Sequence, residues 1–186
     1  MSAIAPALPL TVVIRSGAEP ASQGEPCSGL YVVEGGVLLS RCLTDDGRRL
    51  AELLGPGDAV GGPEGLPSPV TVRALRTCRL RPALPQERPA LLDSRTARAF
   101  ALAHEMAWVG VAERVERRLR ETAARFGSPV QGGLGLGVRL TQEDLADLAG
   151  TTRESANRAV RTLVASGRLA IIGRGRYVLR TLAAAG

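Results

Sequence analysis

The chain has 186 residues, of which 45% are hydrophobic, and this length suits one large domain or two small ones with a buried core. All 24 basic residues are arginine, and the formal net charge is +6. The charge is uneven, because residues 1–90 carry nine arginines and nine acids, whereas residues 151–186 carry seven arginines and the single acid Glu154. A neutral body joined to a basic C-terminal end is typical of a protein that binds a polyanion.

The N-terminal stretch and the cysteines indicate in which cellular compartment the protein is expected. The opening residues are mildly apolar, but they lack a basic start and include Pro6 and Pro9, so they do not resemble a signal peptide. No later run approaches the roughly 18 apolar residues of a membrane span. Cys27, Cys42 and Cys78 are widely separated and odd in number, which indicates neither a disulfide framework nor a CxxC metal site. We expect a cytoplasmic protein with reduced thiols, no bound metal and no membrane contact.

The residues up to about 90 predict an all-β barrel or jelly roll. Short runs rich in Val and Leu indicate strands: LTVVI, GLYVV, GVLLSRC, RLAELL and VTVRALRTCRL. Turn residues separate these runs, namely Gly35-Gly36, Asp45-Asp46-Gly47 and Gly55-Pro56-Gly57.

After Pro89 the pattern becomes helical, with a candidate N-cap at Ser94 and a stop at Gly127. An apolar stripe with one histidine recurs at spacings of three and four: Phe100, His104, Trp108, Val111, Val115 and Leu119. This stripe either packs on the β domain of its own chain or forms the seam of a homodimer. We predict that its first four residues, Phe100 to Val111, lie in a dimer interface. The Gly-rich segment GSPVQGGLGLGVR that follows is either a hinge or a loose hairpin, and it does not fit the GxGxxG phosphate loop.

Residues 139–165 predict two helices joined by a tight turn. Thr141 and Asp144 have the spacing of a capping box, and Gly150 ends the first helix. Thr151 and Thr152 are candidate N-caps of the second helix. This is the pattern of a helix-turn-helix, whose second helix enters the major groove of DNA. The segment RLAIIGRGRYVL after Gly167 predicts two short strands with arginines at the tip, which is a basic wing.

The outer face of the second helix carries side chains that contact DNA. We expect base reading by Arg153, Glu154, Asn157 and Arg158. A second group is expected to hold phosphates: Thr141, Thr152, Arg161, Arg174 and Arg176. A merely solvated helix would also carry charges, but solvation does not explain why acids nearly vanish after Glu154.

Residues of about 139–180, LTQEDLADLAGTTRESANRAVRTLVASGRLAIIGRGRYVL, resemble the winged helix-turn-helix of the Crp-Fnr transcription regulators. They include the RExxxR reading motif of that family as Arg153, Glu154 and Arg158. The N-terminal half is more weakly similar to the family's cyclic-nucleotide-binding-like β-roll, through GLYVVEGGVLL, DDGRRLAELLGPGDAVG and VRAL. The resemblance implies an α+β protein with a β-roll over residues 1–92, a long helical region with the dimer helix over 93–126, and the winged helix-turn-helix over 127–186.

The sequence departs from the cyclic-nucleotide-binding members of that family in the loop that holds the phosphate. Those members have a Gly-Glu-Leu segment and an Arg-Ser or Arg-Thr pair, whereas this region reads GGPEGLPSPVTVRAL, with Ser68-Pro69 near the position of the pair. No arginine occurs between Arg49 and Arg73, so a cyclic phosphate has no guanidinium partner in this loop. The cysteine cluster of the iron–sulfur members is also missing. We therefore expect no cofactor.

The residues and the resemblance together predict a homodimeric transcription regulator with double-stranded DNA and RNA polymerase as partners. Two recognition helices related by a twofold axis would read half-sites of a pseudo-palindrome about one helical turn apart. One histidine and three isolated cysteines assemble no catalytic triad, which excludes an enzyme. The alternative is a ligand-gated regulator whose β-roll senses an unidentified small molecule or a thiol signal.

Overall fold

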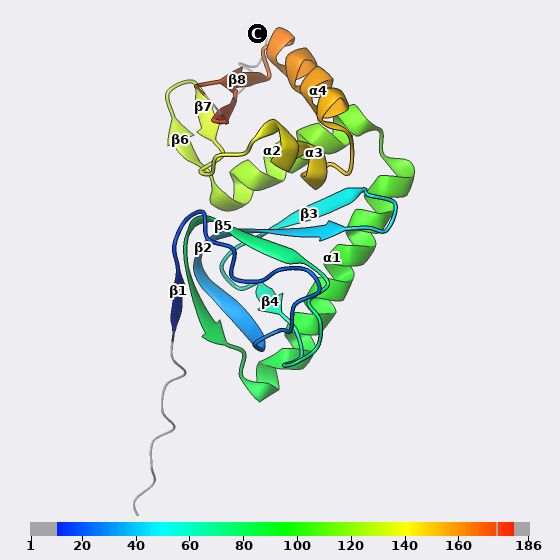
Figure 1. Cartoon of the computed structure of the whole chain (residues 1–186). Coiled ribbons are helices and arrows are strands. Elements are labelled where there is room, and N and C mark those ends of the chain that lie inside the picture. The colour runs from blue at the N-terminus through cyan, green and yellow to red at the C-terminus, as the bar shows by residue number, and fades with distance from the viewer. Residues whose placement is uncertain (1–10, 174, 181–186) are drawn as a thin grey trace, which may run out of the picture.

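The computed structural model describes residues 11–173 and 175–180, which form two antiparallel sheets connected by helices (Figure 1). The N-terminal sheet lies at one end of the molecule, and the helix-rich C-terminal part lies at the other. Within the described ranges, no helix has the length and apolar character needed to cross a membrane.

The N-terminal sheet confirms the predicted β-roll. Its strands are β1 (Val12–Ile14), β2 (Leu30–Leu43), β3 (Arg49–Leu54), β4 (Ala59–Gly61) and β5 (Thr71–Pro82). They run in the order β1-β5-β2-β3, and β4 pairs with β2. The short strand β4 was not predicted, because three residues after a turn carry too little periodicity to be recognised.

The predicted turn at Gly35-Gly36 is wrong, because both glycines lie inside the continuous strand β2. The pairing of β2 with β5 shifts register between Val33 and Leu38, so the glycines mark a bulge. Gly36 has φ +92°, and a Cβ at this position would lie 2.4 Å from the carbonyl oxygen of Thr77. Gly36 is therefore needed for a close approach between two strands and not for a chain reversal.

The helical region consists of two helices, α1 (Arg88–Trp108) and α2 (Val111–Phe126), and is not continuous. A one-turn 3-10 helix (Pro85–Glu87) precedes α1, so the region begins before the predicted boundary at residue 93. Ser94 is not an N-cap but lies within α1, where its hydroxyl accepts a hydrogen bond from Arg98 at 3.2 Å. The chain is extended at Val109 and Gly110, and Gly110 caps the start of α2.

The break at Gly110 separates the predicted stripe into two parts. Phe100 and Trp108 lie on α1 and are 73% and 79% exposed, and His104 between them is also exposed. Val111 is half-buried and belongs to α2. Val115 and Leu119 are fully buried in the C-terminal core, so the expectation of one stripe with one partner is wrong for these two residues.

The C-terminal part contains α3 (Gln142–Leu148), α4 (Arg153–Ala165) and a sheet of β6 (Ser128–Val130), β7 (Gly133–Gly135), β8 (Leu169–Ile171) and β9 (Tyr177–Leu179). The sheet order is β6-β7-β9-β8. The Gly-rich segment is thus a hairpin, the second of its two predicted alternatives, and it extends the sheet of the wing.

One hydrophobic core crosses the boundary between the two ends of the molecule. On β2 and β3, alternate residues such as Leu38 and Leu54 fill the interior of the β-roll. Their neighbours Leu39 and Leu53 join the core of α2, α3 and α4. The C-terminal part is therefore packed on the β2–β3 ribbon and is not attached by a linker alone.

Candidate nucleic-acid interface

The α3–α4 unit is built by local signals in the sequence. The capping box at the start of α3 is confirmed: the Thr141 hydroxyl accepts from the Asp144 amide at 3.0 Å, and the Asp144 carboxylate accepts from the Thr141 amide at 2.9 Å. The Thr152 hydroxyl accepts from the Ser155 amide at 3.2 Å and starts α4. Gly150 between the helices has φ +55°, and a Cβ there would lie 2.3 Å from Sδ of Met106 on α1. The turn therefore packs tightly against α1.

Helix α4 has one buried and one solvent-facing side. Four residues are buried in the core: Ala156, Ala159, Val160 and Leu163. Arg153, Glu154, Arg158 and Arg161 are exposed, and Asn157 is half-buried at the edge. Within the described part of the chain, the three arginine side chains form no hydrogen bond or ion pair, so their donors are available to a ligand.

The wing places one predicted phosphate-binding residue in solvent. Strands β8 and β9 pair from Leu169 to Leu179, and their turn is closed by a hydrogen bond of 2.8 Å from the Ile172 amide to the Arg176 carbonyl. The Arg176 side chain is exposed, whereas Tyr177 beside it is buried, and desolvation raises the pKa of its phenol. Arg174, which was also predicted to hold phosphate, lies outside the described residues.

The first helix of the unit, α3, carries acids that bind the β-roll. Asp144 accepts from Nη2 of Arg41 at 3.1 Å and from Nη2 of Arg73 at 2.5 Å. Asp147 lies 2.6 Å from Nε of Arg41. Both carboxylates are buried, and desolvation raises the pKa of Asp147 although Arg41 opposes the shift. These pairs hold α3 on strands β2 and β5, and no local pattern predicted them.

Comparison with known families accounts for both halves of the chain. Residues 11–87 match the cyclic nucleotide-binding domain, and residues 113–184 match the Crp-like helix-turn-helix domain. The chain belongs to the Crp-Fnr family. This is a family of transcription regulators and not of enzymes, and its helix-turn-helix binds DNA.

Three similar proteins illustrate the comparison. The CRP-like cAMP-activated global transcriptional regulator of Mycobacterium tuberculosis is 27% identical over a match of 172 residues, and the match covers 82% of this chain and 76% of that protein. The structure of FixK2 from Bradyrhizobium japonicum is 28% identical with a TM-score of 0.66, and 94% of each chain is covered. The c-di-GMP responsive regulator CLP of Xanthomonas campestris has a TM-score of 0.75 at 23% identity, with 93% and 94% covered.

Arg114 positions the helix-turn-helix and was missed by the sequence analysis. It is buried on α2, and its guanidinium donates to three backbone carbonyls: Nε to Ala149 at 2.8 Å, Nη2 to Gly150 at 3.2 Å and Nη1 to Val109 at 2.6 Å. Two of these carbonyls lie at the C-terminal end of α3, where a positive charge is favourable. Arg114 thus joins the turn of the reading unit to the break between α1 and α2. Its arginine-rich surroundings in the sequence gave no sign of burial.

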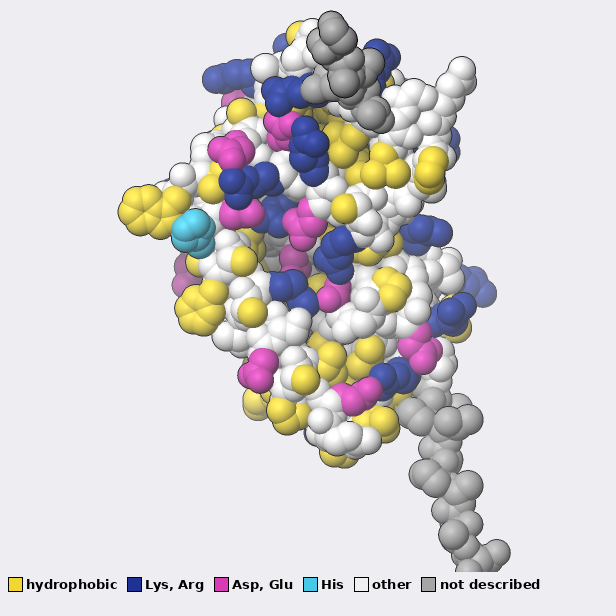
Figure 2. All heavy atoms as spheres, turned by 180° about the vertical axis from the view of Figure 1, so that it is seen from behind, with side chains coloured by type: hydrophobic (Ala, Val, Ile, Leu, Met, Phe, Trp, Pro, Cys, Tyr) yellow, Lys and Arg dark blue, Asp and Glu magenta, His cyan; other side chains and the backbone are white. Residues whose placement is uncertain are grey.

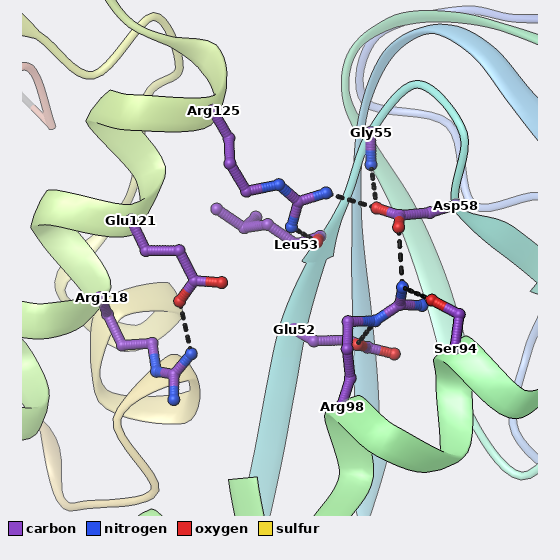
Figure 3. A network of polar contacts seen from close by, with 9 residues as sticks. All are labelled: Glu52, Leu53, Gly55, Asp58, Ser94, Arg98, Arg118, Glu121 and Arg125. Atoms are coloured by element: carbon purple, nitrogen blue, oxygen red, sulfur yellow. Dashed lines mark hydrogen bonds and ion pairs between the residues drawn. The ribbon is translucent and has the colours of Figure 1, made fainter. Parts of the chain in front are cut away.

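A second polar centre, at Asp58, connects the β-roll of this Crp-Fnr chain to both long helices. Figure 3 shows Asp58 between Arg125 of α2 and Arg98 of α1. Its carboxylate accepts from Arg98 at 2.8 Å and from the Gly55 amide at 2.8 Å, and it also binds Arg125. The centre holds α1 and α2 at defined positions on the turn between β3 and β4.

A cavity of about 750 Å³ lies beside this centre, between the β2–β3 ribbon, α1 and α2. Gly61, Gly62 and Pro63 line it, and they belong to the segment GGPEGLPSPVTVRAL, which the sequence analysis compared with the phosphate loop of nucleotide-binding members. The hydroxyl of Ser68 is not available to a ligand, because it donates to the Val70 carbonyl at 2.7 Å. Glu64 is exposed and is not part of the lining.

Proposed function

We propose that this Crp-Fnr chain acts as a homodimer that reads a pseudo-palindromic DNA site through α4 and does so without a cyclic nucleotide. The observation that carries the proposal is that three exposed arginines on α4 form no ion pair with any described residue: Arg153, Arg158 and Arg161. Arginine fits the acceptor edge of guanine bidentately, and it binds phosphates. Arg41 and Arg98, at the contacts between the β-roll and the helices, are instead used in ion pairs.

Helix α1 supports the homodimer. None of its 21 residues is buried in the single chain, although Phe100 and Trp108 are large and apolar. Figure 2 shows hydrophobic side chains along this side of the molecule, next to its one histidine. Two aromatic residues at helical spacing on an exposed helix are expected to be covered, and a second copy presents a matching face across a twofold axis. Phe100, His104 and Trp108 remain the predicted seam, with Val111 at its end.

The loop after β4 supports independence from cyclic nucleotides. It contains no arginine, Pro63 and Pro69 have no amide proton to donate, and Ser68 is bonded within its own loop. Two relatives are named for cAMP and c-di-GMP, so related proteins already differ in the signal they use. A thiol signal has less support, because burial raises the pKa of Cys78 and disfavours its reactive thiolate.

The function implies one further partner and a location. A dimer that reads a promoter acts together with RNA polymerase, and it acts in the cytoplasm, where bacterial chromosomes lie. Arg153, Glu154, Asn157 and Arg158 are proposed to read bases. Thr141, Thr152, Arg161, Arg174 and Arg176 are proposed to hold phosphates.

The test uses operator DNA selected from a random oligonucleotide pool, with affinity measured by fluorescence anisotropy. Arg153→Ala and Arg158→Ala should each weaken operator binding by about 1–3 kcal/mol and relax the preference at one base position. Arg120→Ala on the exposed side of α2 removes the same charge away from α4 and serves as the matched control. An equal loss on operator and on random DNA would contradict base reading by α4.

A further inference from the structure

The cavity between the β2–β3 ribbon, α1 and α2 combines apolar walls with four arginines. Leu50, Leu92 and Leu102 are among its apolar lining residues. The arginines come from the two helices: Arg95, Arg98, Arg118 and Arg125. A volume of about 750 Å³ with mainly apolar walls and a few polar groups has the dimensions of a small-molecule site.

Carboxylates of the same chain neutralise three of the four guanidinium groups. The ion pairs are Arg98 with Glu52 and Asp58, Arg118 with Glu105 and Glu121, and Arg125 with Asp58. Arg95 differs, because none of the described carboxylates lies within ion-pair distance of it. Its Nη1 donates to the carbonyl oxygen of Gly61 at 2.7 Å, and that is its one hydrogen bond among the described residues.

A half-buried guanidinium without a counter-ion favours an anion as its partner, because the charge has lost part of its hydration. The lining also contains three carboxylates, but each is paired with Arg98 or Arg118: Glu52, Glu105 and Glu121. Pro63 and Pro69 have no amide proton to donate to a polar ligand. The surroundings therefore suit a ligand with one negative group and an apolar body.

We propose that this cavity binds a small, mostly apolar monocarboxylate whose carboxylate pairs with Arg95. The apolar body would lie against Leu50, Leu92 and Leu102, in contact with the β-roll and α1 together. Because α2 forms the opposite wall, a bound molecule also favours one arrangement of α2 relative to the β-roll. The site does not depend on the proposed DNA-binding function, and it is tested without DNA.

The test compares two fluorescent probes that share one ring system. 8-Anilinonaphthalene-1-sulfonate carries a negative charge, and N-phenyl-1-naphthylamine is its neutral counterpart. Arg95→Gln should lower the affinity for the charged probe about tenfold and change the affinity for the neutral probe by less than about twofold. Only the charged probe loses its ionic partner in this variant. Arg88→Gln, on the same helix but outside the cavity, is the matched control and should change neither. Decanoate should displace the charged probe, and decan-1-ol should do so much less effectively.

Three outcomes would overturn the proposal. The first is equal binding of the charged probe by the native protein and Arg95→Gln, which would place the probe on another apolar surface. The second is displacement by cyclic AMP but not by decanoate, which would make the cavity a nucleotide site. The third concerns Ala99→Phe, a variant whose phenyl ring fills the cavity from α1. It should weaken the binding of both probes, and it tests the site even if Arg95→Gln does not fold. Unchanged binding by this variant would show that neither probe enters the cavity.

Discussion

The ion pairs between α3 and the β-roll give a quantitative prediction for Arg41→Met. The substitution keeps much of the apolar stem of Arg41 but removes the cation that lies 3.1 Å from Asp144 and 2.6 Å from Asp147. Breaking a buried pair from one side leaves an uncompensated charge and costs about 3–5 kcal/mol. Arg41 is partly exposed and Arg73 still neutralises Asp144, so we expect the lower end, about 3 kcal/mol of unfolding free energy.

Arg49→Met is the matched control on the adjacent strand. Arg49 pairs with Glu143 of α3, but the two side chains are 45% and 56% exposed. An exposed pair contributes about 0–1 kcal/mol, so the same substitution should have a small effect here. The assay is chemical denaturation followed by far-ultraviolet circular dichroism.

The pH dependence of Arg41→Met tests the assignment of the loss to Asp147. Burial raises the pKa of Asp147 above its ordinary value, and Arg41 opposes this shift, so the variant raises the pKa further. A carboxyl whose pKa is higher in the folded state destabilises the fold when ionised, and the penalty disappears when it is protonated. The stability difference between the variant and the native protein should therefore shrink as pH falls from about 7 toward about 5. Similar losses for both substitutions, or a deficit independent of pH, would refute the reasoning.

Three further predictions concern the dimer, the wing and the signal. Trp108→Asp places a charge in the predicted seam, and sedimentation should show monomers that bind half-sites poorly; an intact dimer would return α1 to a role within one chain. Arg176→Ala should weaken binding to all DNA sequences and lower the salt slope by about one unit, and an unchanged slope would leave the wing tip in solvent. Titration with cyclic AMP or cyclic GMP should change neither operator affinity nor melting temperature, whereas a tenfold rise in affinity, about 1.4 kcal/mol of coupling, would show that the loop was misread.

Local signals allowed much of the reading unit to be predicted. The capping box of Thr141 and Asp144, the N-cap Thr152 and the buried side of α4 depend on residues a few positions apart, so spacing alone reveals them. The turn at Asp45–Gly47 was recognised for the same reason. Which of the α4 side chains touch bases remains a prediction.

Interactions between distant segments could not be predicted in this way. The break at Gly110 divides a periodic stripe into an exposed part on α1 and a buried part on α2, because the two helices pack against different neighbours. Gly36 lies in a bulge and not a turn, since its close contact is with Thr77, which is distant in the sequence.

From its sequence alone, the chain's family, the order of its β-rich part, helical region and helix-turn-helix, and the charged side of α4 could be determined, because these follow from motifs and periodicity. The tertiary structure decided which charges are used internally and which are available. No local pattern in the sequence distinguishes the roles of Arg114, Arg41 and Arg153. Arg114 is buried and binds backbone carbonyls, Arg41 binds the acids of α3, and Arg153 faces solvent. The partner of an arginine depends on sheet register and helix docking, which bring together residues far apart in the chain.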